Sequence, residues 1–186
     1  VYFIDFLIAT NKDYYKFSKS IYFNFGRIDG IIYDIPKLCK QTLFEQQKLE
    51  EFYKIMNINF YTKLIIIKSL IPLIKLSKSP SIIFTTHNIN IPKTYWNAYI
   101  YANTSLQILI KFLQEEYKKI IKINQIQLEY NNNDLYFKKY PGIIKKNKTN
   151  IKNLINIYIY LIKNKKINNK IIIINKNTNI YKKSDN

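Results

Sequence analysis

The chain has 186 residues and a formal net charge of +18, and Ile, Lys, Asn and Tyr together make up more than half of it. With three glycines and one cysteine, it is neither a collagen-like chain, a Gly/Ser linker nor a disulfide scaffold. Its 47% hydrophobic and 23% charged residues argue against wholesale disorder. The four favoured residues have A- or T-rich codons, which we interpret first as mutational drift in an AT-rich genome.

The positive charge is compatible with a nucleic-acid partner but does not require one. Phosphate recognition prefers arginine, whose planar fork binds two oxygens at once, and the chain has a single arginine, Arg27. Its lysines are spread over most of the sequence. We therefore expect them to be solvated surface residues. Nucleic-acid binding remains the weaker alternative, and it would lie in the lysine-dense segment 145–183.

Single copies of cysteine and histidine limit the possible chemistry. Cys39 is alone, which excludes an intrachain disulfide and indicates a reducing, cytoplasmic compartment. His87 is alone as well, which argues against a histidine metal site, and we expect it in a loop or satisfied at the surface. The apolar stretches are too short or too often interrupted by lysine to span a bilayer, so no membrane segment is predicted.

Apolar runs and helical spacing alternate along the chain. The first helix has Tyr14, Phe17 and Ile21 on one face, Asn11 as its expected cap and Gly26 at its end. In chain order we expect a strand at Tyr2–Phe6, a helix at Asn11–Phe25, a strand at Ile28–Tyr33, helices at Phe44–Met56 and Asn57–Leu76, a strand at Ser81–Thr85, a helix at Trp96–Tyr117, a strand at Ile121–Leu128, a helix at Ile151–Ile162 and a strand at Ile171–Asn175.

This order predicts an α/β fold. Strands that are continuous apolar runs, separated by helices of ten or more residues, are typical of a parallel sheet covered on both faces. No linker or internal repeat divides the sequence, so we expect one domain over residues 1–186, with residues 176–186 as a frayed tail.

Between residues 49 and 117 a series of motifs becomes specific. Its members, in order, are Phe52-x-x-x-Met56-x-x-Asn59, Leu70-Ile71-Pro72-Leu73, Ser81-Ile82-Ile83-Phe84-Thr85-Thr86, Trp96-Asn97-Ala98-Tyr99 and Leu113-Gln114-Glu115-Glu116-Tyr117. Together they resemble the central half of the short-chain dehydrogenase/reductase superfamily. The resemblance implies a doubly wound, mainly parallel Rossmann-like sheet that binds NAD or NADP.

The same resemblance implies the site residues. Tyr99 stands at the position of the tyrosine that exchanges a proton with the substrate, and Asn59 at that of the relay asparagine. Thr86, thirteen residues before Tyr99, stands at the serine position, or His87 does if the intervening loop has lost a residue. Asn103 occupies the position of the lysine that assists the tyrosine. For the cofactor, the resemblance points to Asp5 and Asp34.

Several positions depart from the family pattern. A lysine at position 103 would favour the phenolate by roughly 3–4 kcal/mol, for a distance of about 4–5 Å and an effective dielectric constant of about 20, and Asn103 cannot supply this field. The family's Asn-Ala-Gly is Asp34-Ile35-Pro36 here, and its Pro-Gly is Leu128-Glu129. The glycine-rich phosphate loop is missing, so we expect the fold to lack its first βαβ unit.

Two functions follow as expectations. The first is an NAD(P)-dependent oxidoreductase of short-chain dehydrogenase type, with a small-molecule substrate and an eroded or inactive site. The second is a non-catalytic remnant or interaction protein that keeps the fold. In either case we expect a homo-oligomer formed through the helices at 57–76 and 96–117, because these carry apolar residues on more than one face.

Overall fold

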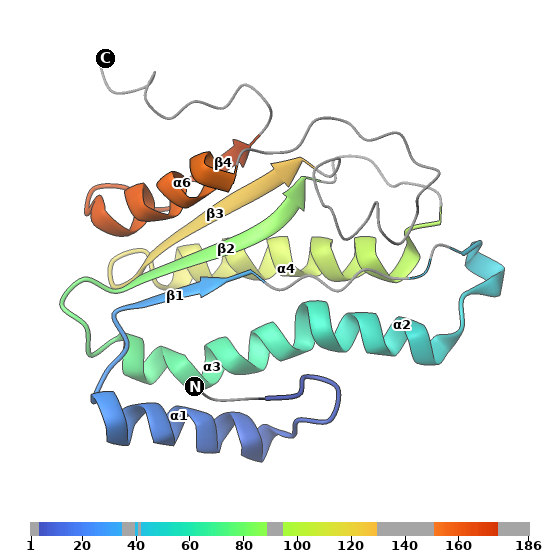
Figure 1. The fold of residues 1–186 in the computed structure, drawn as a ribbon, viewed down its shortest axis with the longest axis horizontal. Coiled ribbons are helices and arrows are strands. Elements are labelled where there is room, and N and C mark those ends of the chain that lie inside the picture. The colour runs from blue at the N-terminus through green and yellow to red at the C-terminus, as the bar shows by residue number, and fades with distance from the viewer. Residues whose placement is uncertain (1–3, 35–39, 41, 89–94, 130–150, 175–186) are drawn as a thin grey trace.

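The centre of the protein is a parallel sheet of four strands, seen in a computed structural model that describes residues 4–34, 40, 42–88, 95–129 and 151–174 (Figure 1). The strands are β1 (Gly30–Tyr33), β2 (Ser81–Asn88), β3 (Lys122–Glu129) and β4 (Ile171–Ile174), and they lie side by side in that order. Gly30 is paired with Ser81, Ser81 with Lys122, and Gln125 with Ile171. The predicted parallel sheet and the predicted neighbours of its first three strands are confirmed.

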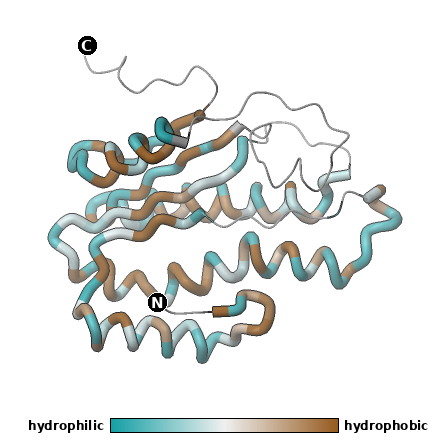
Figure 2. The backbone as a smooth tube through the Cα atoms, viewed as in Figure 1, coloured by the Kyte–Doolittle hydropathy of each residue, from teal (hydrophilic) through white to brown (hydrophobic). Residues whose placement is uncertain are grey.

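Helices cover both faces of the sheet (Figure 1). They are α1 (Asn11–Phe25), the 3-10 turn η1 (Phe44–Gln46), α2 (Leu49–Met56), the π-helical turn η2 (Asn57–Tyr61), α3 (Thr62–Ile74), α4 (Asn97–Glu116) and α6 (Ile151–Lys163). Residues of α1, α3 and α4 pack with Ile82 and Phe84 on one face, and residues of α6 pack with Ile83 and Ile126 on the other. This division follows from the alternation of side chains along β2. Figure 2 shows the resulting apolar colouring of the strands and of α3.

Several predicted elements differ from those observed. Residues 4–6 of the predicted strand Tyr2–Phe6 are not in a strand: the Asp5 carbonyl accepts hydrogen bonds from Ile8 and Ala9 in a turn. The physical reason is that no described strand lies beside this segment to pair with it. The predicted helix Phe44–Met56 is divided, since η1 ends at Gln46 and α2 begins at Leu49. The irregular segment 131–148 and the tail 176–186 lie outside the described residues.

The predicted cap of the first helix is also wrong by one position. Thr10, not Asn11, precedes α1, and the Asp13 carboxylate accepts hydrogen bonds from the Thr10 amide at 2.8 Å and from the Thr10 hydroxyl at 2.7 Å. This arrangement satisfies the start of the helix. The helix ends as predicted at Gly26, whose positive φ of 74° is easily adopted only without a side chain.

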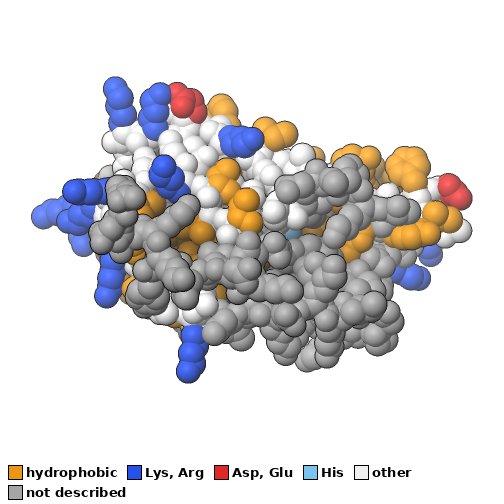
Figure 3. All heavy atoms as spheres, turned by 90° about the horizontal axis from the view of Figure 1, so that it is seen from above, with side chains coloured by type: hydrophobic (Ala, Val, Ile, Leu, Met, Phe, Trp, Pro, Cys, Tyr) orange, Lys and Arg blue, Asp and Glu red, His pale blue; other side chains and the backbone are white. Residues whose placement is uncertain are grey.

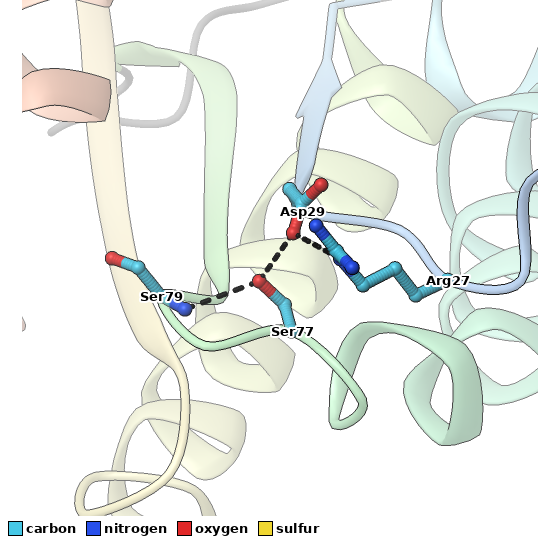
Figure 4. Close-up of polar contacts among 4 residues, drawn as sticks. All are labelled: Arg27, Asp29, Ser77 and Ser79. Atoms are coloured by element: carbon cyan, nitrogen blue, oxygen red, sulfur yellow. Dashed lines mark hydrogen bonds and ion pairs between the residues drawn. The ribbon is translucent and has the colours of Figure 1, made fainter.

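The amino-terminal edge of the sheet is fixed by a small polar cluster. The Ser77 hydroxyl donates to Asp29 Oδ1 at 2.6 Å, and Arg27 Nε donates to the same oxygen at 2.9 Å. The Ser79 amide donates to the Ser77 hydroxyl at 3.1 Å (Figure 4). The cluster ties the turn after α3 to the start of β1. It lies at the opposite end of the strands from the carboxyl-terminal ends, where ligands bind in folds of this kind.

One stretch of helix within the described residues, Leu49–Ile74, is long and apolar enough to cross a membrane by length and composition. Half of its most apolar 18-residue window is buried inside the protein. Ile66, Ile67, Leu70 and Ile74 contribute to this burial because they pack into the core beneath the sheet. The stretch therefore has the character of a core helix.

Candidate active site

Tyr99 and His87 form a buried pair at the carboxyl-terminal end of β2. Tyr99 lies in the first turn of α4 and His87 is the penultimate residue of β2, and their side chains are 3% and 5% exposed. The Tyr99 hydroxyl is hydrogen-bonded to His87 Nδ1. Trp96 packs its ring edgewise on Tyr99, with the centroids 5.6 Å apart. The predicted loop or surface position of His87 is therefore wrong: the strand continues through it, and α4 covers it.

Asn103 lies one turn further along α4 and holds the backbone of His87. Its Oδ1 accepts from the His87 amide at 3.3 Å, and its Nδ2 donates to the His87 carbonyl at 3.0 Å. Gln107 Nε2 donates to the same carbonyl at 3.3 Å. Among the described residues, β1 is paired with β2 as far as Phe84, and beyond that point the amide of Asn103 satisfies the backbone of His87.

The two threonines before His87 point to different partners. The Thr86 hydroxyl accepts a hydrogen bond from Gln125 Nε2 of β3 at 2.8 Å, and the side chain is buried. The Thr85 hydroxyl is hydrogen-bonded to that of Tyr158 in α6. Of the two residues considered for the serine position, His87 is the one that contacts Tyr99 through a hydrogen bond.

Asn59 lies in η2, the π-helical turn between α2 and α3. It is 4% exposed, and η2 packs against α4, the helix that carries Tyr99. A π turn inserts one extra residue into a helix, and such turns are frequent at functional sites. The sequence predicted an uninterrupted helix over 57–76 and gave no indication of this turn.

Lys63 follows Asn59 by four residues and is buried, with 3% of its surface exposed. Its ammonium lies over the ring of Tyr33 at the end of β1, 5.1 Å from the ring centroid. Asp34, the next residue after Tyr33, interacts electrostatically with Lys63. Within the described residues the Lys63 ammonium has neither a hydrogen bond nor an ion pair. Lys63 was not among the predicted site residues, although its spacing of one helical turn from Asn59 could have indicated it.

Burial and mutual charge shift the acid–base properties of this group of residues. Burial lowers the pKa of Lys63 to about 8, and the carboxylate of Asp34 opposes that shift. Burial, and second the charge of Lys63, lower the pKa of His87 to about 4. Asp34 is in part exposed, yet the surrounding protein raises the pKa of its carboxyl above the ordinary value. At neutral pH His87 is therefore an uncharged imidazole, able to accept a hydrogen bond at Nδ1.

The structure brings Tyr99, Asn103 and His87 together and places Asp34 near Lys63. Asp5 lies in the turn before α1, where its carboxylate accepts a hydrogen bond from the Leu7 amide at 2.9 Å. The described residues contain no cluster of three or more His, Cys, Asp or Glu side chains suited to a metal ion.

No family model matches the chain. Among curated proteins, it is similar to the uncharacterised oxidoreductase YciK of Escherichia coli K12, with 22% identity over 124 residues. This alignment covers 66% of the chain and 49% of YciK, so the chain spans about half the length of the curated relative it matches.

Solved structures are similar over a larger share of the chain. A protein from Shigella flexneri 2a, described as a short-chain dehydrogenase in complex with NADP, gives a TM-score of 0.84 at 18% identity and covers 92% of this chain and 73% of its own. The 0.95 Å structure of YciK gives 0.83 at 17% identity, over 92% and 72% of the two chains. The chain thus has the Rossmann-like α/β fold. Its predicted resemblance to the short-chain dehydrogenase/reductase superfamily is confirmed.

Proposed function

We propose that this protein is an oxidoreductase of short-chain dehydrogenase type whose active site has departed from the pattern of the superfamily. Tyr99 is its acid–base residue, Asn59 belongs to the same site, and NAD or NADP is the cofactor of the type. A small molecule is the substrate. The similarity to YciK and the fold shared with an NADP-bound structure support this proposal.

The main evidence that this site departs from the superfamily pattern is the role of Asn103. Both polar atoms of its amide are hydrogen-bonded to the backbone of His87. The residue is 6% exposed, so little of it is accessible to a ligand. At this position the superfamily places a lysine that contacts ribose and assists the tyrosine. Asn103 supports β2 instead, and we infer that neither Asn103 nor Thr86 performs the chemistry expected from its position.

The described residues do not suit the phosphate half of a nicotinamide dinucleotide. Such phosphates bind at a helix amino terminus behind a glycine turn. The two described glycines have other roles. Gly26 ends α1, and Gly30 begins β1, where a Cβ atom would contact the Ser81 carbonyl oxygen. Asp34 adds a carboxyl group at the end of β1. We therefore infer that this chain binds NAD or NADP weakly or not at all.

The test is a fluorescence titration of the purified chain with NADH and NADPH, beside the variant Asn103→Lys. We expect no saturation at micromolar concentrations for either protein. The variant loses both hydrogen bonds to His87 and leaves the backbone amide unpaired, which costs roughly 1–3 kcal/mol of stability. It therefore unfolds at a lower urea concentration and gains no activity.

Thr104→Lys is the matched control, since it adds the same charge at the next, exposed position of α4. It should leave stability and cofactor titration unchanged. Micromolar binding of NADH or NADPH by the unaltered chain would contradict the proposed loss of cofactor affinity. Recovery of dehydrogenase activity in Asn103→Lys would contradict the structural role of Asn103.

We also infer a homo-oligomer in the cytoplasm. α3 is less suited to a subunit contact than predicted, because Ile66, Ile67 and Leu70 pack in the protein's own core. α4 is better suited to such a contact, because Ile108 and Phe112 are exposed on one stripe of the helix.

A further inference from the structure

Lys63 is an unusual charge for this fold. It is the one lysine buried within the part of the chain that the structure describes. A buried ammonium normally requires an ion pair or hydrogen bonds, because leaving water is costly for a charge. Here the described surroundings offer the ring face of Tyr33 and the field of Asp34, and no hydrogen bond. The burial of the Lys63 ammonium therefore needs a functional explanation.

The position of Lys63 connects it with the His87–Tyr99 pair. α3 carries it under the carboxyl-terminal end of the sheet, beside Tyr33, which is paired with Phe84 three residues before His87. Its charge reaches the imidazole of His87, which in turn is hydrogen-bonded to Tyr99. Lys63, His87 and Tyr99 thus form one electrostatically connected group drawn from α3, β2 and α4.

We propose that Lys63 is the positioning charge of this site, acting from α3 on the His87–Tyr99 pair in place of the lysine absent from position 103. The inference rests on the proposed function in one respect, namely that Tyr99 is the acid–base residue. It differs from the superfamily arrangement in the helix that carries the cation. It also differs in the imidazole that lies between the cation and the phenol.

Burial of the imidazole and the charge of Lys63 together limit where the Tyr99 proton can go. The phenol has His87 Nδ1 as a proton acceptor within hydrogen-bond reach, and a substrate oxygen would be a second. Proton transfer to His87 would create a buried imidazolium, which the loss of hydration opposes first and repulsion by the charge of Lys63 opposes second. The same positive charge stabilises a phenolate. Lys63 therefore adds to the burial that keeps His87 a neutral acceptor, and the Tyr99 proton stays available to a substrate.

The other titratable groups around His87 do not replace this effect. Tyr99 of α4 is hydrogen-bonded to the imidazole, Asp34 and Tyr33 lie at the end of β1, and Tyr158 of α6 contacts Thr85 and interacts with Asp34. These groups are neutral or negative at pH 7. Among the described groups that interact with the imidazole, Lys63 is the one that supplies positive charge.

His87 makes the proposal directly measurable, since it is the only histidine of the chain. Long-range ¹H–¹⁵N spectra of the ligand-free protein report the protonation of each ring nitrogen from pH 8 down to 4. We expect an unprotonated Nδ1 at pH 7 and a titration midpoint near the bottom of this range. Lys63→Met should raise the midpoint by about one pH unit, the size expected for one interior charge at an effective dielectric constant of about 20.

Three further variants separate this role from packing. Lys63→Arg keeps the charge and should keep the low midpoint, while Lys68→Met, at an exposed position of the same helix, should not move it. Tyr99→Phe should shift the Nδ1 resonance at pH 7, a measurement that needs no acid. An unchanged midpoint in Lys63→Met, or an equal rise in Lys63→Arg, would overturn the proposal. Because no cofactor is added, these outcomes are independent of the cofactor titrations.

Discussion

At the scale of single residues, Asn103 and Lys63 differ from the superfamily pattern in the roles that we propose for them. Asn103 stands where a lysine is expected and supports the backbone of His87. Lys63 stands on another helix and supplies the positive charge. An asparagine can form two hydrogen bonds to the backbone but cannot supply a positive charge. In this site Asn103 therefore supports the strand, and Lys63 supplies the charge.

The buried charge of Lys63 gives a pH dependence of stability. Its pKa is about 8 in the folded protein, below the ordinary 10.5, so between these values the unfolded chain binds more protons. The free energy of unfolding therefore rises with pH across this window, by about 3 kcal/mol from this residue. Urea unfolding at pH 7, 8, 9 and 10 measures the rise. Lys63→Met should lack it and should exceed the unaltered protein in stability at pH 7.

Lys68→Met is the control here as well, because Lys68 lies at an exposed position of the same helix. It should follow the unaltered protein at every pH. All other titratable groups are the same in the unaltered protein and in Lys63→Met, so the difference between these two curves isolates Lys63. Parallel curves for Lys63→Met and the unaltered chain would show that the ammonium is solvated in the folded state.

The sequence predicted some of these residues and missed others for a physical reason. Tyr99 and Asn59 were predicted because their spacing follows the superfamily series. His87 was predicted only as an alternative at the serine position, and Lys63 was not predicted, because their surroundings join a strand end and a helix face that meet only in the folded chain. The sequence places Lys63 one helical turn from Asn59 but does not reveal its burial, which results from packing against Tyr33 of β1.

At the scale of elements, buried asparagines complete strand pairing where backbone partners are missing. Asn124 of β3 is fully buried, and its Oδ1 accepts from the Lys170 amide at 3.0 Å while its Nδ2 donates to the Ile167 carbonyl at 3.2 Å. Asn168 adds a bond from the Ile123 amide to its Oδ1 at 2.9 Å. These contacts fix the segment between α6 and β4, and so the register in which Ile171 meets Gln125.

Replacing Asn124 by leucine tests this role. The substitution keeps the branched shape of the side chain and leaves the Lys170 amide and the Ile167 carbonyl without their side-chain partner. Each unsatisfied buried group costs about 1–3 kcal/mol, so two of them give an expected loss of roughly 2–6 kcal/mol in urea unfolding. Asn156→Leu, at an exposed position of α6, makes the same chemical change and should alter stability little. A loss below that of Asn156→Leu would contradict the assigned role.

The elements themselves were largely predictable, and the exceptions have local causes. α1 has the predicted bounds because its apolar spacing and Gly26 define both ends. The interruption at η2 and the gap between η1 and α2 were not predictable, since a π turn and a 3-10 turn share the composition of the helices beside them. Strand ends shifted by one residue at β3, which is within the ordinary uncertainty of such boundaries.

At the scale of the whole molecule, one exposed apolar surface lies on α2 and α4. On the face drawn in Figure 3, hydrophobic side chains lie at the end of the molecule where α2 lies, and many of the lysines lie toward the opposite end. Tyr53 of α2 and Tyr101, Ile108 and Phe112 of α4 are each more than half exposed. Phe52 packs against Tyr101 with ring centroids 5.8 Å apart, so α2 and α4 contribute to one apolar surface.

This surface predicts the assembly. Tyr101, Ile108 and Phe112 recur at intervals of seven and four residues along α4, which places them on one stripe that a second copy of the helix could cover. The double substitution Ile108→Lys with Phe112→Lys introduces two like charges into that contact and should convert a dimer into a monomer at micromolar concentration, measured by light scattering.

Phe23→Lys is the matched control for the interface on α4. Phe23 is 81% exposed on α1, away from α4, and its replacement should leave the dimer intact. A monomer before any substitution, or dissociation caused equally by Phe23→Lys, would contradict an interface on α4. Because neither Ile108 nor Phe112 touches the His87–Tyr99 pair through any described hydrogen bond, the ring spectrum of His87 should be the same in monomer and dimer, and that comparison separates assembly from the chemistry of the site.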